Sequence, residues 1–175
     1  TYNLAITAGL AFYDAKLTED YCGVTSPITG DPITHCPAGS VVDGIAFPDG
    51  PAAPSGSRLP VTARFKGNLT ARYTTDMWGG EGFAQASLVY QGDRTVDLRK
   101  AAAETFGDLK AYTLTDLSVG YRRNNWSVDL FLKNAFDERA ELARFAVCKV
   151  ETCGAEPYTV VAQPRTFGIR FSQDF

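Results

Sequence analysis

A strictly alternating stretch between Val61 and Tyr73 constrains the fold more than any other feature of the sequence. Apolar residues or glycine occupy every odd position from 61 to 73, and polar residues occupy every even position from 62 to 72. A period of two places side chains of one kind on one face of a β-strand. Such a run has a chance on the order of 10⁻⁴ per window when about half the residues are apolar. The stretch therefore predicts a strand with one apolar and one polar face.

Five further segments follow the same rule less strictly. They span 2–13, 84–91, 116–122, 126–133 and 166–172. Phe131 occupies a position where the alternation calls for a polar residue. Together with the first stretch, the segments predict an all-β fold of six antiparallel strands.

The connections between these segments alternate between long and short. Long ones span about 18–57, 92–111 and 137–157, whereas 75–82 and 123–125 are short. Compact soluble domains seldom carry several long loops. Outer-membrane barrels combine long extracellular loops with short periplasmic turns. The alternation therefore favours transmembrane strands and predicts that the three long segments are extracellular.

Charge and hydropathy exclude other classes of protein. The net charge is −3. Proteins that bind nucleic acids usually carry a basic patch, so we expect no nucleic-acid partner. No apolar run approaches the roughly 20 residues of a membrane-spanning helix. The chain starts at Thr1 without an initiator Met or a signal peptide, so we expect a mature protein or a piece of a longer one.

Aromatic residues gather near the predicted strand ends. Tyr and Trp at 73, 78, 121 and 126 flank the short turns, and tyrosines at 13, 90 and 158 lie near the long segments. Two interfacial girdles of a barrel would have this distribution. The alternative is that aromatic residues simply favour strands.

Five blocks of sequence carry a resemblance to a known family. They are RLPV at 58–61, FKGNL at 65–69, LTDLSVGY at 114–121, WSVDLFLKNAFD at 126–137 and QPRTFGIRF at 163–171, followed by the terminal Phe175. In this order they resemble the C-terminal end of the barrel of TonB-dependent outer-membrane receptors.

The resemblance implies a function for the parent protein. Such receptors enclose an N-terminal plug in a 22-stranded barrel, contact the TonB protein through a segment ahead of the plug, and import a scarce nutrient such as a ferric siderophore or other chelate across the bacterial outer membrane. Neither the plug nor the TonB-contacting segment matches any stretch here. Six strands cannot close around a plug, because barrel diameter grows with strand number. We therefore expect all of 1–175 to be the C-terminal segment of such a barrel.

The four cysteines form two pairs that are local in the sequence. Of the three possible pairings, Cys22 with Cys36 and Cys148 with Cys153 is the simplest. Disulfides in these loops would require an oxidising compartment. The alternative is a zinc or copper site formed by Cys22, Cys36 and His35. Because His35 and Cys36 are adjacent, they make poor geometry for binding one ion. We therefore expect the protein to contain no metal and no cofactor.

Five cations fall on the predicted polar faces. They are Arg64, Lys66, Arg72, Arg122 and Arg170. In a barrel these residues would face the lumen and could attract an anionic cargo. They could instead pair with acidic residues of the plug or simply meet water.

The last strand resembles the signal that the barrel assembly machinery reads on outer-membrane proteins. Thr166, Gly168 and Phe171 match the pattern of a polar residue, a glycine and spaced aromatics, whereas Gln173 replaces an expected hydrophobic residue. Strand addition would recognise backbone and alternate side chains of such a segment. Phe175 would complete the signal or serve only as a girdle aromatic.

No catalytic arrangement is visible in the sequence. His35 has no serine nucleophile motif, and no glycine-rich phosphate loop follows a strand. We therefore expect a transporter and not an enzyme, with outer-membrane lipid and a small-molecule nutrient as partners. Two alternatives remain, a small self-contained outer-membrane barrel, which would need at least about eight strands, and a soluble β-barrel that binds a small apolar ligand inside.

Overall fold

The computed structural model describes residues 3–145 and 156–174. Its main element is a six-stranded antiparallel sheet in the order β1-β4-β5-β6-β7-β10, beside two small two-stranded sheets, β2-β3 and β8-β9. The strands are β1 Leu4–Phe12, β2 Ser40–Val42, β3 Ile45–Phe47, β4 Phe65–Met77, β5 Gly80–Gln91, β6 Tyr112–Arg123, β7 Trp126–Lys133, β8 Glu141–Phe145, β9 Tyr158–Val161 and β10 Thr166–Gln173, and the helix is α1 Lys100–Phe106. The prediction of an all-β antiparallel fold is confirmed.

Each of the six predicted segments contains a strand of the main sheet, but the predicted start of β4 is wrong. The strand begins at Phe65 and not at Val61. Val61 has a φ of 62°, which is outside the β region and rare for a β-branched residue. Its backbone N–H donates to Thr95 O at 2.8 Å. The alternation at 61–64 therefore does not reflect a strand.

The two short turns are tighter than the sequence predicted. Trp78 and Gly79 alone connect β4 to β5, with φ values of 49° and 74°. Positive φ at both central residues is what a two-residue type I′ hairpin requires. Asn124 in the other turn also has a positive φ, 52°. The residues on either side, such as Thr75 and Gly82, are paired in the ladder.

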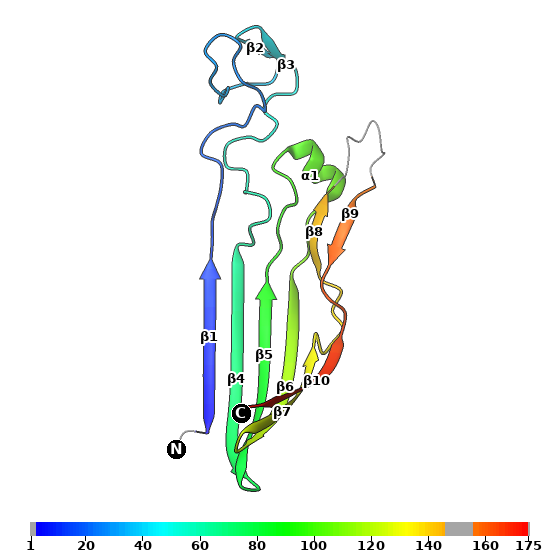
Figure 1. The fold of residues 1–175 in the computed structure, drawn as a ribbon. Helices are drawn as coiled ribbons and strands as arrows, with labels where there is room; N and C mark the ends of the chain where they lie inside the picture. Colours follow the sequence, from blue (N-terminus) through cyan, green and yellow to red (C-terminus); the bar gives the residue numbers. More distant parts are fainter. Residues whose placement is uncertain (1–2, 146–155, 175) are drawn as a thin grey trace.

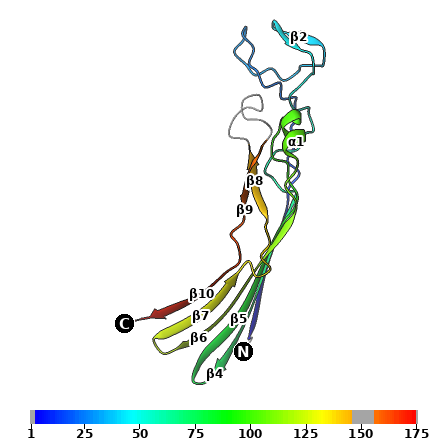
Figure 2. The same ribbon diagram turned by 90° about the vertical axis from the view of Figure 1, so that its right-hand side faces the viewer.

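The described parts of the three long connections lie beyond one end of the sheet, and the two short turns lie at the other end (Figure 1). The β2-β3 hairpin lies farthest from the short turns in both views, and Figure 2 shows the strands curving together below it. The long segments also contain short elements that the sequence did not predict, namely β2 and β3, α1 and β8. In the described part of the chain no helix has the length and apolar character needed to cross a membrane.

The register gives the sheet one continuous apolar face. One row across all six strands consists of Ile6, Ala71, Ala86, Leu117, Leu132 and Phe167, and the next of Leu4, Tyr73, Ala84, Val119, Leu130 and Ile169. Phe167 and Ile169 are 86% and 71% exposed. No described residue covers this face, although an apolar area of this extent normally has an apolar partner. In the described part of the chain the sheet is open and its apolar side is not enclosed.

The small core lies in the first long connection and not under the sheet. Cys22, Ile33, Cys36 and Phe47 are buried together, with Val42 and Ile45 packed against them. None of these residues belongs to the six-stranded sheet, so the cluster packs the β2-β3 region against its own connection.

Candidate functional site: the polar face of the sheet

Four of the five predicted cations lie on the face opposite the apolar one. Lys66 and Arg72 belong to β4, Arg122 to β6 and Arg170 to β10, all at polar positions of the register. Arg64 lies just before β4, where its guanidinium is 3.7 Å from Asp14 and 5.7 Å from the centre of the Phe12 ring. It therefore does not join the other four.

Arg72 is held in place by two contacts with β5. Its guanidinium carbon lies 3.6 Å from the centre of the Phe83 ring, and its Nη1 donates to Gln85 Oε1 at 3.2 Å. A cation over a ring face is attracted by the ring quadrupole. Phe83 in turn lies over Gly120, where an added Cβ would come within 2.7 Å of the ring Cζ. The glycine thus lets the ring lie along the sheet and support the arginine.

Phe131, the exception to the alternation, has the same relationship with the next strand. It pairs with Gly168 of β10, and a Cβ at that position would lie 2.9 Å from both ε carbons of the ring. Covering a strand glycine with a cross-strand aromatic is a recognised way to stabilise a sheet. Gly168 therefore has a local packing role, whatever part it plays in assembly.

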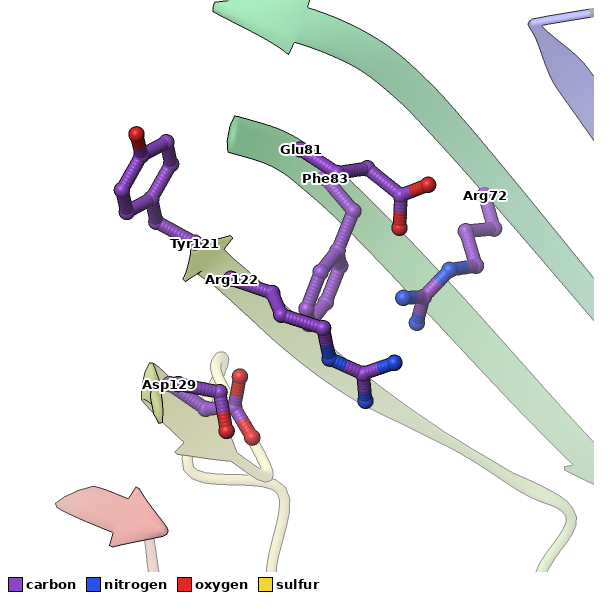
Figure 3. Close-up of a pocket in the computed structure, with 7 residues that line it drawn as sticks. Arg72, Glu81, Phe83, Tyr121, Arg122 and Asp129 are labelled. Carbon is purple, nitrogen blue, oxygen red and sulfur yellow. The ribbon is translucent and has the colours of Figure 1, made fainter. Parts of the chain in front are cut away.

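Two adjoining recesses lie among these side chains. The smaller one, of about 240 Å³, is shown in Figure 3, where the guanidiniums of Arg72 and Arg122 extend into the same space as the carboxylates of Glu81 and Asp129. The larger one, of about 490 Å³, extends from Arg72 towards Arg170. Glu81 is the Cα partner of Arg122, and Asp129 is the partner of Arg170. Within the described ranges these groups nevertheless form no ion pair with one another.

A buried asparagine fixes the point where the last long connection leaves the sheet. The Asn134 side chain donates to the carbonyls of Glu138 and Gln163 at 3.0 and 2.9 Å, and its Oδ1 accepts from Glu138 N at 2.9 Å. Its backbone N–H donates to the carboxylate of Asp116. Sequence reasoning did not single out this residue, although a polar residue directly after a strand and inside a resembling block was an available signal.

Two arginines join the second and third long connections. Arg94 is 2% exposed, and its Nη2 donates to the carbonyls of Glu141 and Leu142 at 3.0 and 2.7 Å. Arg144 donates to Phe106 O at the end of α1 and pairs with the Glu141 carboxylate. We call Arg94 and Arg144 the loop clasp, because they connect the α1 segment to β8.

The first cysteine pair is a disulfide in the small core. Cys22 and Cys36 are bonded, with a Cα–Cα distance of 6.2 Å, which confirms that predicted bridge. Both thiols of the alternative metal set with His35 are therefore consumed. Cys148, Cys153 and the terminal Phe175 lie outside the described residues.

Two carboxyls outside the strands have shifted pKa values. A hydrogen bond from Lys16 lowers the pKa of Asp14, and hydrogen bonds from Arg99 lower the pKa of Asp97. In both cases the lowered pKa favours the ionised carboxylate beside a cation two residues away in the chain.

Comparison with known proteins identifies the family. A family model described as TonB dependent receptor-like, beta-barrel, matches residues 3–135. The chain belongs to the TonB-dependent receptor family. No curated protein matches the sequence.

A solved uptake receptor has a similar fold. The chain resembles the crystal structure of the ferric yersiniabactin uptake receptor FyuA from Yersinia pestis with a TM-score of 0.59 and 20% sequence identity, over 73% of this chain. The match spans only 18% of that receptor. At this identity the similarity establishes the barrel fold, and it agrees with the expectation of a barrel segment.

Proposed function

We propose that this chain is the C-terminal barrel segment of an outer-membrane receptor that takes up a scarce nutrient and has no enzymatic activity. The single observation that carries the proposal is the sheet itself, whose apolar face runs without interruption over six strands while its other face carries charge. Lipid would cover the first face, and a water-filled or plugged lumen would meet the second.

The orientation follows from the two ends of the sheet. The long connections 18–57, 92–111 and 137–157 would be extracellular and the two short turns periplasmic. Trp78, Tyr121 and Trp126 support this assignment, because they cluster at the turn end with ring centres 6.4 and 5.6 Å apart. Aromatic rings of this kind are favoured at the boundary of a membrane.

The parent receptor would work with several partners. TonB would engage it through a segment that is not part of 1–175, and the barrel assembly machinery would read β10. The cargo would be a ferric siderophore or another chelate, and the cations on the polar face, Lys66, Arg72, Arg122 and Arg170, would give the lumen wall a positive character that suits an anionic complex. The similarity of the fold to that of a ferric yersiniabactin uptake receptor supports this class of cargo.

Uptake measurements on the full-length receptor test the proposal. Cells that carry the intact gene should accumulate a ⁵⁵Fe-labelled chelate, and a protonophore should abolish the accumulation, because import across the outer membrane depends on energy from the inner membrane in this family. Cells without the gene should not accumulate it. Equal accumulation in both strains for every chelate in a panel would contradict the proposed function.

A further inference from the structure

The larger recess on the polar face has the features of a ligand site. Its volume of about 490 Å³ lies within the range of about 300 to 1,000 Å³ that is usual for small-molecule pockets. Phe83 and Phe131 line it, and both rings lie along the sheet because their cross-strand partners are glycines. The recess therefore has an aromatic floor of two rings.

Positive charge dominates the walls of this recess. Its lining includes three cations, Arg72, Lys133 and Arg170, and one carboxylate, Asp129. Asp129 forms no ion pair with any of these cations among the described residues. An anion that entered the recess would find cations whose charge is not already neutralised by a close partner.

Arg72 is the cation best prepared to bind an anion. The Phe83 ring and Gln85 fix its guanidinium, so little conformational entropy would be lost on binding. Only Nη1 has an acceptor among the described residues, and an arginine has five N–H donors in a planar fork that matches a carboxylate. The free donors can make a charge-assisted, bidentate contact.

From this arrangement we propose that the recess binds an organic anion, namely a carboxylate attached to a planar or apolar group. The carboxylate lies against the guanidinium of Arg72 and within reach of Arg170, and the apolar group lies on Phe83 and Phe131. The inference rests on the proposed function only in placing the polar face inside a barrel. The anion is either a diffusing solute or a carboxylate side chain from another part of the receptor.

The test uses the full-length receptor in detergent micelles and 4-fluorobenzoate as the probe, observed by ¹⁹F NMR. Variants are Arg72→Gln, Arg170→Gln and Phe83→Leu, with Lys16→Gln in a loop as the matched control. Each variant is first checked for the heat-modifiable migration of a folded barrel. A solute site predicts that the wild type and Lys16→Gln bind the probe, and that Arg72→Gln and Arg170→Gln each weaken binding at least tenfold. Neutral 4-fluorobenzyl alcohol should bind far more weakly than the benzoate.

A carboxylate supplied by the receptor itself predicts a different result. The wild type would not bind the probe, but Arg72→Gln and Arg170→Gln would raise amide exchange at least tenfold in one segment outside 1–175, whereas Lys16→Gln would not. The inference is overturned if neither pattern is found, or if the alcohol binds as tightly as the benzoate. If neither pattern is found while chelate uptake persists in the wild type and in all variants, the recess is rejected and the proposed function stands.

Discussion

The phenyl ring of Phe131 lies over Gly168, its cross-strand partner on β10. Phe83 has the same relationship with Gly120 on β6. Both rings are on the face that carries the charged side chains of the sheet. The positions of these two rings reflect packing, because each ring covers a position where the neighbouring strand has no side chain.

Replacing Gly168 with alanine should destabilise the folded barrel by about 1 to 3 kcal/mol, because the new methyl group forces the Phe131 ring out of its position. Urea unfolding of the full-length receptor in micelles measures the loss. Ser172→Ala, on the same face of the same strand, is the control and should change stability little.

A double mutant separates this packing role from the predicted assembly role of Gly168. If packing against Phe131 explains the glycine, Phe131→Ala removes the clash. Gly168→Ala should then lower the stability of the Phe131→Ala protein by less than half of what it costs the wild type. If the assembly machinery reads the glycine, the alanine variant should lower the amount of folded barrel in cells equally with or without Phe131.

The loop clasp should control the mobility of the last long connection. Arg94→Met removes the donor to the part-buried carbonyls of Glu141 and Leu142, and the loss of hydrogen bonds from a charged donor weakens the attachment of β8. Hydrogen exchange should become at least tenfold faster over 141–145, while Lys16→Met, which removes only an exposed pair with Asp14, should leave it unchanged. Unchanged exchange in the Arg94 variant would show that the clasp does not hold β8.

Reduction of the Cys22–Cys36 disulfide should loosen the first long connection only. The bridge contributes roughly 3 kcal/mol to a loop of this length in the chain-entropy model. Limited proteolysis should become faster within 18–57 after reduction and stay the same within 92–111. Mass spectrometry of an unreduced digest should also show Cys148 linked to Cys153, and free thiols at both positions would refute that second bridge.

The strands were predictable from the sequence because the side chains on one face of each strand are mainly apolar. β7 was predicted to the residue, since its alternation starts and stops with the pairing. The start of β4 was predicted wrongly, because nothing in the pattern at 61–64 indicates that Val61 adopts a positive φ.

The site was less predictable than the strands. The pattern put Lys66, Arg72, Arg122 and Arg170 on one face, but the recess depends on side chains from several strands whose register a single sequence does not specify. The loop clasp joins Arg94 to Glu141 across a separation of 47 residues, and no local pattern encodes such a contact. Arg64 lies in the segment that precedes β4, and its contacts with Asp14 and Phe12 were not encoded in the alternation.

The terminal strand should matter for assembly of the full-length receptor. Removing Phe175, or changing Phe171 to Asp, should lower the amount of heat-modifiable folded barrel in the outer membrane, because strand addition reads alternate side chains. Phe106→Ala is the control, since the contact of Phe106 with Arg144 uses the backbone carbonyl and survives the substitution. Normal levels of folded barrel after both terminal changes would leave Phe175 only a place in the aromatic girdle.

The central claim is that lipid covers one face of the sheet and the lumen lies along the other. Fluorophores attached singly at positions 65, 69, 130 and 169 of the full-length receptor, and at 66, 70, 129 and 170, test it in bilayers that contain a lipid-linked quencher. The first set occupies the apolar face and the second the polar face. We predict strong quenching for the first set and weak quenching for the second, and equal quenching of both sets would contradict the assignment of the chain to a transmembrane barrel.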